Sequence, residues 1–515
     1  MAQFHRVASF IVATPVPNED QDFQQQQQKR LVSLPPTIDK LMEPFSMKKL
    51  RKVKNMFFLI EMNKLLNIDI FKRTERDIMD QSAGVLWSHG SPLMKIDSKP
   101  IVEEKSPING KISRFSIVER HRSPVNEVSL SIIDELKYKK ICYFTNWAQY
   151  RLGPARFDPE NIDPFLCTHI IYAFANIDNQ TLLITTVEDN DEDLYRRINA
   201  LKTLNPKLKT VLAVGGWNMK SYAFSTMVHN HEKRRNFIFD TINFLRKHNF
   251  DGLEVDWEYP GIRGGQTNDK YYLTLFLQEF KDAAIAQAIV TGQLRLILAA
   301  AVAANQEIVV NAYEIGKIAK ILDFINIMTY DFHGAWQNYT GVNAPLYRRY
   351  DELDRDGSLN QDFGITIWLE NGAPAHKLVL GVPLFARSFL LARSDQTDIH
   401  SPTVGNGSAG LFTRIPGFLS YFEVCLLQTD SKWQKRTVTD GSESEYMFRD
   451  REWVSYESVD NIRKRAAYVV AKNLGGMFVW SLDMDDFNGA FCNNGTYPYI
   501  RNSLALLPTS MPSYV

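Results

Sequence analysis

The chain has 515 residues, of which 44% are hydrophobic and 12% aromatic, a balance typical of a globular protein with a substantial core. Its 59 basic residues are matched by 59 acidic residues, so the formal net charge is zero. This balance gives no indication of nucleic-acid binding, and no apolar run approaches the roughly 20 residues that span a bilayer. We therefore expect no nucleic-acid partner and no membrane partner.

Residues 1–137 differ in composition from the rest of the chain. They contain a run of glutamines at 24–28, a basic cluster at 48–54 and many Ser, Pro and Glu residues, without a sustained hydrophobic period. This composition predicts a largely disordered extension. A sorting or nucleic-acid role for the basic cluster, or a protein-interaction role for the extension, is an alternative interpretation.

The start of the chain does not resemble a secretory signal. Met1 is not followed by an apolar core and a cleavage site, and the apolar residues 56–60, which faintly resemble such a core, are interrupted by Glu61. An incorrectly joined gene model upstream of the predicted domain would explain the missing signal, and so would a location inside the cell.

Eight short β-rich runs alternate with amphipathic helical stretches from about residue 139 onward. Helices are expected at 193–204, 232–247 and 271–288. Eight such βα units close as a (β/α)8 barrel, so the predicted fold is an α/β TIM barrel. The eight runs are residues 141–146, 169–175, 210–214, 252–257, 296–302, 324–329, 378–382 and 477–481.

The gap between the seventh and eighth runs is too long for a single helix. We therefore expect a small inserted α+β module at residues 389–455, forming one wall of a deep groove. The barrel and this module together predict a domain of residues 138–507, followed by a tail of residues 508–515.

The fourth run carries acidic residues at alternate positions. Side chains two apart on a strand share a face, so Glu254, Asp256 and Glu258 project together. Acids about 6–7 Å apart in a low-dielectric interior repel each other, so we expect one of them to hold a proton at neutral pH. A solvated edge strand is an alternative, but the apolar opposite face favours a buried strand, where paired acids suit glycoside chemistry.

This stretch resembles the DxxDxDxE signature of the family 18 glycoside hydrolases, which comprise the chitinases and the chitinase-like lectins. The resemblance implies that Glu258 protonates the glycosidic oxygen and that Asp256 stabilises the positive charge formed when the substrate's own acetamido group attacks. Tyr330 would hold the acetamido carbonyl, and Glu254 and Asp251 would tune Asp256. The resemblance implies neither a metal nor a cofactor.

The ends of the other runs carry aromatic and polar residues that describe a stacking groove for a sugar polymer. Any one of these aromatics is more often a core residue. By resemblance, Trp147 and Trp217 serve the non-reducing side of the groove, Trp336 serves the reducing side, and Trp480 lies under a sugar ring. The other residues expected to line the groove are Tyr143, Phe174, Gly215, Gly216, Asn218, Tyr259, Met328, Asp331 and Arg387.

Four cysteines permit two disulfides but do not require them, and four buried thiols are the alternative. The resemblance implies the pairs Cys142–Cys167 and Cys425–Cys492, and with them an oxidising compartment and secretion. Secretion conflicts with the absence of a signal at Met1. The resemblance also implies strained or cis peptide bonds before Phe174, Tyr259 and Ser481.

Four residues, in three places of the chain, depart from the family pattern. Glu254 stands where the family has Asp, Phe385-Ala386 replaces Tyr-Gly before Arg387, and Asp189 replaces a common Trp. We expect a monomeric chitinase that acts on chitin or chitooligosaccharides, with endo-type cleavage favoured and exo-type cleavage as the alternative. The departures keep open the alternative of a chitinase-like lectin that binds chitooligosaccharides without cutting them.

Overall fold

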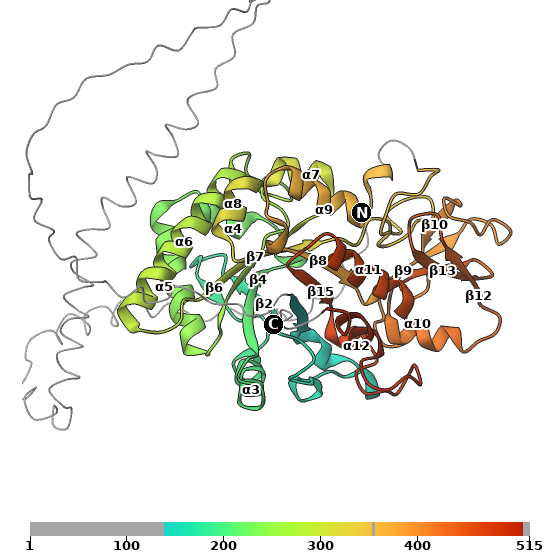
Figure 1. The fold of residues 1–515 in the computed structure, drawn as a ribbon, viewed down its shortest axis with the longest axis horizontal. Helices are drawn as coiled ribbons and strands as arrows, with labels where there is room; N and C mark the ends of the chain where they lie inside the picture. Colours follow the sequence, from blue (N-terminus) through green and yellow to red (C-terminus); the bar gives the residue numbers. More distant parts are fainter. Residues whose placement is uncertain (1–137, 353–355, 508–515) are drawn as a thin grey trace, which may run out of the picture. The chain divides into compact units, whose positions relative to one another are not determined.

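A computed structural model describes residues 138–352 and 356–507 (Figure 1). The predictions made for residues 1–137 and for the tail 508–515 lie outside the described residues.

Eight parallel strands close into a barrel, which confirms the predicted TIM-barrel fold. Each predicted run overlaps one of these strands, and pairing of the first two strands closes the ring. A short strand, β3 (Ile184–Thr185), pairs antiparallel with the end of β2. In chain order the barrel strands are β1 (Lys139–Thr145), β2 (His169–Ile177), β4 (Lys209–Gly215), β5 (Gly252–Asp256), β6 (Ile297–Ala303), β7 (Phe324–Met328), β8 (Leu378–Pro383) and β15 (Gly476–Trp480).

Helices cover the outside of the barrel (Figure 1). The three predicted helices correspond to α3, α5 and α6, and the buried pair Arg234 and Glu279 joins α5 to α6 through two hydrogen bonds of 2.9 Å. None of the helices in the described ranges is both long and apolar enough to cross a membrane. The helices around the barrel are α3 (Asp191–Leu204), α4 (Tyr222–Val228), α5 (His231–Lys247), α6 (Asp269–Thr291), α7 (Gln306–Ala312), α8 (Ile315–Ile321), α9 (Gln361–Glu370), α11 (Val459–Ala471) and α12 (Pro498–Leu504).

A second, antiparallel sheet lies between β8 and β15 in the chain, as predicted for an α+β insertion. Its first strand begins at Phe385, four residues before the expected start at 389. Phe389 and Trp453 belong to a small apolar core of its own. The elements are β9 (Phe385–Leu391), β10 (Thr403–Asn406), β11 (Phe418–Ser420), α10 (Tyr421–Gln428), β12 (Gln434–Val438), β13 (Ser444–Arg449) and β14 (Glu452–Tyr456).

The covalent and backbone features implied by the family resemblance are present. Disulfides join Cys142 to Cys167 and Cys425 to Cys492, with Cα atoms 6.2 and 5.1 Å apart. The second disulfide ties α10 of the inserted module to the segment that follows β15. The cis peptide bonds are Ala173–Phe174, Glu258–Tyr259 and Trp480–Ser481.

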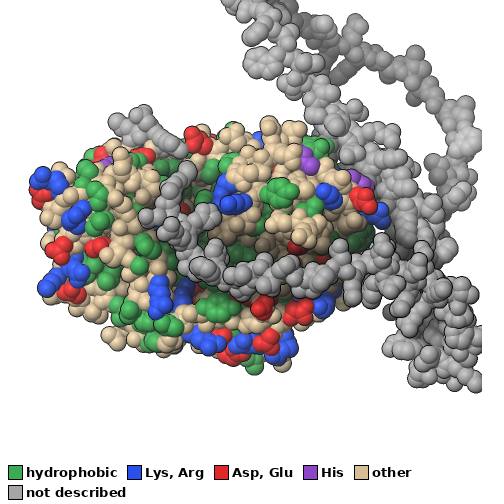
Figure 2. Space-filling view, turned by 180° about the vertical axis from the view of Figure 1, so that it is seen from behind, with side chains coloured by type: hydrophobic (Ala, Val, Ile, Leu, Met, Phe, Trp, Pro, Cys, Tyr) green, Lys and Arg blue, Asp and Glu red, His purple; other side chains and the backbone are tan. Residues whose placement is uncertain are grey.

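The surface of the described domain mixes charges of both signs. Figure 2 shows Lys and Arg side chains interspersed with Asp and Glu over one face, with hydrophobic side chains between them. This mixture agrees with the balanced composition of the sequence.

Candidate active site

The acidic strand β5 is buried, as its apolar face predicted. It pairs with β4 on one side and β6 on the other, so it is not an edge strand. Glu254, Asp256 and Glu258 are 0%, 3% and 9% exposed. The alternate residues Leu253, Val255 and Trp257 belong to the large apolar core outside the sheet. Strand parity therefore separates the acids from the apolar core.

Glu254 is anchored inside the barrel through one carboxylate oxygen. The Tyr143 hydroxyl donates to its Oε1 at 2.8 Å, and the Asn326 side-chain amide donates to the same atom at 2.7 Å. Its Oε2 is buried without a hydrogen-bond partner. Burial raises the pKa of Glu254 to about 7, against the opposing effect of the two hydrogen bonds. Glu254 is thus partly protonated near neutral pH.

Asp256 and Glu258 share this environment. Burial, followed by the charges of Glu258 and Glu254, raises the pKa of Asp256 well above its ordinary value. Burial also raises the pKa of Glu258, while a hydrogen bond with Tyr259 and the charge of Arg263 lower it. Two acids so close cannot both ionise easily, so the pair holds a proton near neutral pH, as expected from the sequence. A protonated carboxyl is the state that a general acid needs.

Tyr330 follows β7 and faces the same acids. Its ring meets those of Phe385 and Phe478 edge-on, at centroid distances of 5.7 and 6.0 Å. Burial and then the charge of Asp256 raise the pKa of Tyr330 well above its ordinary value. The hydroxyl therefore keeps its proton and is available as a donor.

Three aromatic rings stand together where adjacent strands end. Trp147 follows β1, Phe174 lies in β2 and Trp480 ends β15. Their ring centroids are 5.8 to 6.2 Å apart, and the ring of Phe174 stacks on both of the others. Tyr143 lies beneath them, 5.1 Å from Trp480. Trp147 is 39% exposed, so this row presents a flat apolar surface of the kind on which sugar rings stack.

The two glycines at the end of β4 permit a close approach of two loops. Gly215 and Gly216 have φ angles of +120° and +84°, and the Gly216 N–H donates to the Asp256 carbonyl at 2.8 Å. A Cβ on Gly215 would clash with that carbonyl, and one on Gly216 would stand 2.6 Å from the ring of Phe174. These predicted groove residues thus hold the backbone beside the acids.

The remaining groove residues occupy the rim. Trp217 and Asn218 begin a 3₁₀ turn after the two glycines, and both are exposed. Met328 ends β7, and Tyr259 follows the Glu258–Tyr259 cis peptide bond; both are half-buried.

A second group of rim residues brings the barrel and the inserted module together. Arg387 in β9 donates from Nε to Asp331 at 2.7 Å. Its guanidinium lies 5.2 Å from the ring centroids of Trp336 and Phe385, and 5.3 Å from that of Phe418. Trp336 is 60% exposed. The predicted residues Asp331, Trp336 and Arg387 therefore form one cluster.

Asp251, which the sequence analysis expects to tune Asp256, makes its contacts at the other end of β5. Asp251 precedes β5, and the strand between them spans about 16 Å. Its Oδ2 accepts from the Lys202 amine at 2.9 Å and from the Thr210 backbone N–H at 2.9 Å. Asp251 thus braces the opposite end of the barrel.

Two residues near the acids were missed by the sequence analysis. Asn326 is fully buried in β7 and donates to Glu254. A single amide in the apolar run of residues 324–328 was a usable signal, since a buried polar group needs a partner. Arg263 lies in a glycine-rich loop and donates to the Glu258 carbonyl at 3.2 Å. No periodicity points to that contact.

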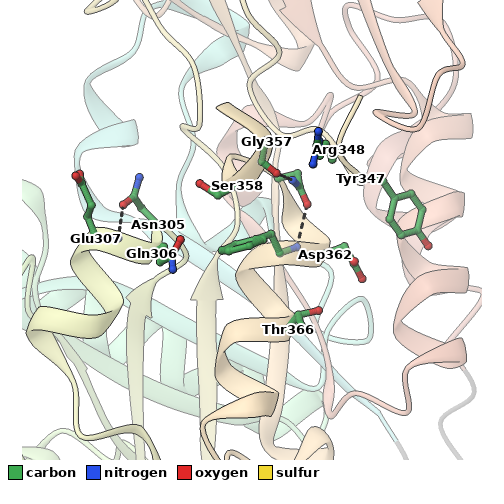
Figure 3. Close-up of a pocket in the computed structure, with 11 residues that line it drawn as sticks. Asn305, Gln306, Glu307, Tyr347, Arg348, Gly357, Ser358, Asp362 and Thr366 are labelled. Carbon is green, nitrogen blue, oxygen red and sulfur yellow. Dashed lines mark hydrogen bonds between the residues drawn. The ribbon is translucent and has the colours of Figure 1, made fainter. Parts of the chain in front are cut away.

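A cavity of about 630 Å³ lies where α7 and α9 begin (Figure 3). Glu307 and Arg348 at this cavity are exposed, unlike the acids of β5. None of the predicted site residues lines it, so we assign the candidate active site to the end of β5. The cavity is lined by Asn305, Gln306, Glu307, Tyr347, Arg348, Gly357, Ser358, Asn360, Asp362, Phe363 and Thr366.

Known proteins share both the sequence and the fold of this domain. Chitotriosidase-1 of Mus musculus is 46% identical over 363 residues, which cover 70% of this chain and 76% of that protein. Chitinase-3-like protein 2 of Homo sapiens is 40% identical over 366 residues, covering 71% of this chain and 91% of that protein.

Solved structures agree. An immunomodulatory active chitinase from Trichuris suis matches with a TM-score of 0.69 at 36% identity, covering 72% of this chain and 100% of that chain. Human YKL-39, described as a pseudo-chitinase with retained chitooligosaccharide binding properties, matches with a TM-score of 0.68 at 39% identity, covering 72% and 99%. Residues 139–485 match the family model, and the chain therefore belongs to the glycosyl hydrolases family 18.

Proposed function

We propose that this chain is a chitinase, which hydrolyses β-1,4 bonds between N-acetylglucosamine units with retention of configuration. The observation that carries the proposal is Glu258, a carboxyl at the end of β5 whose pKa is raised by burial beside a second acid. It is the most exposed of the three acids, at 9%, and so is the one best placed to reach the glycosidic oxygen of a bound sugar.

The reaction runs in two steps. In the first, the Glu258 proton passes to the glycosidic oxygen as the bond from C1 to that oxygen breaks, and the substrate's acetamido oxygen bonds to C1. In the second, water gives a proton to the Glu258 carboxylate and attacks C1, which opens the oxazolinium ring. Asp256 stabilises the positive charge between the steps, and the Tyr330 hydroxyl orients the acetamido carbonyl.

Stacking surfaces support a polymeric substrate and endo-type cleavage. The row of Trp147, Phe174 and Trp480 stands over β1, β2 and β15, while Trp336 stands apart on the loop after β7. Stacking surfaces at the ends of several barrel strands suit a chain of several sugars better than a single ring.

The same proposal covers the context of the enzyme. We propose that residues 138–507 carry the activity, that the chain works as a monomer, and that it acts outside the cell. The two disulfides support the last point, because such bonds persist in oxidising compartments.

A chitooligosaccharide-binding lectin is the second candidate, and the surroundings of Glu254 favour it. The bonds from Tyr143 and Asn326 hold this side chain by one oxygen, and its other oxygen has no partner. The longer side chain therefore need not support Asp256 as the family's aspartate would. Human YKL-39 is a pseudo-chitinase with a similar fold.

Fluorophore release from 4-methylumbelliferyl chitobioside and chitotrioside tests the choice, using the full chain and the variant Glu258→Gln. We expect hydrolysis by the parent and its loss in the variant, with chitotetraose affinity retained in calorimetry. The matched control is Glu307→Gln, an exposed acid at the separate cavity, which should hydrolyse like the parent. Binding without hydrolysis in the parent would establish the lectin instead.

A further inference from the structure

The loop after Glu258 contains an arginine held from both sides. Arg263 has a left-handed backbone, with φ at +53°, although it is not a glycine. Its Nη1 donates to the Glu258 carbonyl at 3.2 Å, and its own carbonyl accepts from the Ser221 N–H at 3.4 Å. The residue therefore joins the loop after β5 to the loop after β4.

The side chain of Arg263 lies on the face of Trp217. The guanidinium carbon is 3.5 Å from the ring centroid, whereas the other arginine–ring contacts in the described ranges measure 5.2 to 5.8 Å. At this distance the guanidinium carbon lies over the face of the ring, where a cation is attracted by the aromatic system. Trp217 is nevertheless 59% exposed, so one face is covered and the other remains open.

The Ser221 side chain makes a second connection between the two loops. The Ser221 hydroxyl accepts from the Trp257 indole N–H at 2.9 Å and donates to the Tyr259 carbonyl at 3.0 Å. Trp257 and Tyr259 flank Glu258 in the chain. The exposed ring of Trp217 and the backbone of Glu258 are thus connected through Arg263 and Ser221.

We propose that Arg263 is a positioning residue that holds Trp217 as a one-sided sugar platform and ties this platform to the backbone of the acid Glu258. The inference rests on the proposed function, because it concerns how a sugar on Trp217 is aligned with the proton donor. A flexible ring would have to be ordered by each substrate molecule, whereas a stacked ring is already in place.

The charge of Arg263 gives this role a second readout. Besides Arg263, the ionisable groups that act on Glu258 or respond to its charge are Asp256, Asp331, Tyr259, Tyr313 and Tyr330. Burial and the charge of Asp331 raise the pKa of Glu258, whereas the charge of Arg263 lowers it. Removing the cation would let Glu258 keep its proton to higher pH. The alkaline limb of the pH–rate profile would then move upward.

The test compares Arg263→Gln and Arg263→Lys in the full chain. Chitotetraose affinity is measured by calorimetry in the Glu258→Gln background, where hydrolysis cannot interfere. We expect Arg263→Gln to weaken binding about two- to fivefold, the range of an exposed cation–π contact. Arg263→Lys keeps the positive charge but lacks the planar guanidinium. It should therefore keep the alkaline limb of the pH–rate profile at its parental position without the full chitotetraose affinity.

Two further variants separate this role from general effects. Arg235→Gln removes a comparable half-buried arginine, whose guanidinium lies 5.8 Å from the Phe239 ring on α5, and should leave affinity and pH profile unchanged. In Trp217→Ala the Arg263→Gln change should no longer weaken binding, because the two residues act together.

Each outcome decides a part of the inference. If the folded Arg263→Gln chain bound chitotetraose as tightly as the parent, Arg263 would not hold Trp217 for sugar binding. If the alkaline limb of its pH–rate profile did not move, Arg263 would not act on Glu258. A parent that binds without hydrolysing would overturn the proposed function and the pH effect with it, while the affinity comparison would still decide the platform role.

Discussion

The two ends of β5 carry acids of similar chemistry in opposite surroundings. Before the strand, Asp251 is half-exposed and lies within 2.9 Å of a lysine amine and a backbone N–H. After it, Asp256 and Glu258 are buried beside each other, and their pKa values are raised. Asp251 therefore has a cation and a hydrogen-bond donor beside it, whereas Asp256 and Glu258 are buried next to another acid.

This difference shows what distinguishes a structural acid from a reactive one. A nearby cation and hydrogen-bond donors stabilise the charged form of a carboxylate. Acids buried beside like charges retain a proton that can be given to a substrate. The reactive set lies at the carboxyl end of the strand, where the loops of a TIM barrel gather.

The largest expected effect is on kcat, and it distinguishes the two ends of β5. Asp256→Asn should lower kcat on 4-methylumbelliferyl chitobioside by about a hundredfold or more, because the developing positive charge loses its counter-charge. Asp251→Asn makes the same chemical change at the other end and should leave kcat within about twofold. Equal losses of kcat in two folded variants would contradict the distinction.

The unpaired acids should also make stability depend on pH. Glu254 has a pKa of about 7 when folded and about 4.5 when unfolded, so the folded chain binds more protons between these values. The free energy of unfolding should therefore fall as pH rises through this window, by at most about 3 kcal/mol for this group. Urea unfolding of the parent at several pH values measures this slope.

Glu254→Gln should flatten that slope. Glutamine can accept the bonds from Tyr143 and Asn326 through its carbonyl oxygen, and it does not titrate. The exposed acid Glu307 gives the matched control, since Glu307→Gln should leave the slope as in the parent. An unchanged slope in Glu254→Gln would show that another buried acid is responsible.

Much of this arrangement was readable from the sequence because it follows strand periodicity. The alternation of Glu254, Asp256 and Glu258 with Leu253 and Val255 required a two-sided buried strand, and β5 is one. The eight runs had the spacing of βα units and became the barrel strands.

The position of Asp251 away from the three buried acids follows from its spacing in the sequence. Asp251 is three residues before Glu254, an odd number, so a continuous strand would turn the two side chains to opposite faces. The contact of Arg263 with Trp217 was not readable at all. It depends on a left-handed backbone at a non-glycine residue, and such a conformation is set by tertiary contacts rather than by periodicity.

A smaller effect on stability is expected at the N-terminal end. Asp251→Asn should lower the free energy of unfolding by about 2 kcal/mol, because it weakens charge-assisted bonds to Lys202 and to the Thr210 backbone. Chemical denaturation at neutral pH measures the loss. Asp193→Asn, which removes an exposed acid paired with Arg196 on α3, is the control and should change stability far less.

The smallest effect separates the ion pair from the hydrogen bonds at this end. Lys202→Met keeps the packing of the side-chain stem but removes the amine, and it should lower the free energy of unfolding by less than about 1 kcal/mol. The reason is that both partners are partly exposed, with side chains 16% and 26% accessible, so water screens their attraction. In the Asp251→Asn background the lysine change should cost still less. If Lys202→Met instead lowered the free energy of unfolding as much as Asp251→Asn, the ion pair with Lys202 would account for the stabilisation by Asp251. The hydrogen bond from the Thr210 N–H would then contribute little.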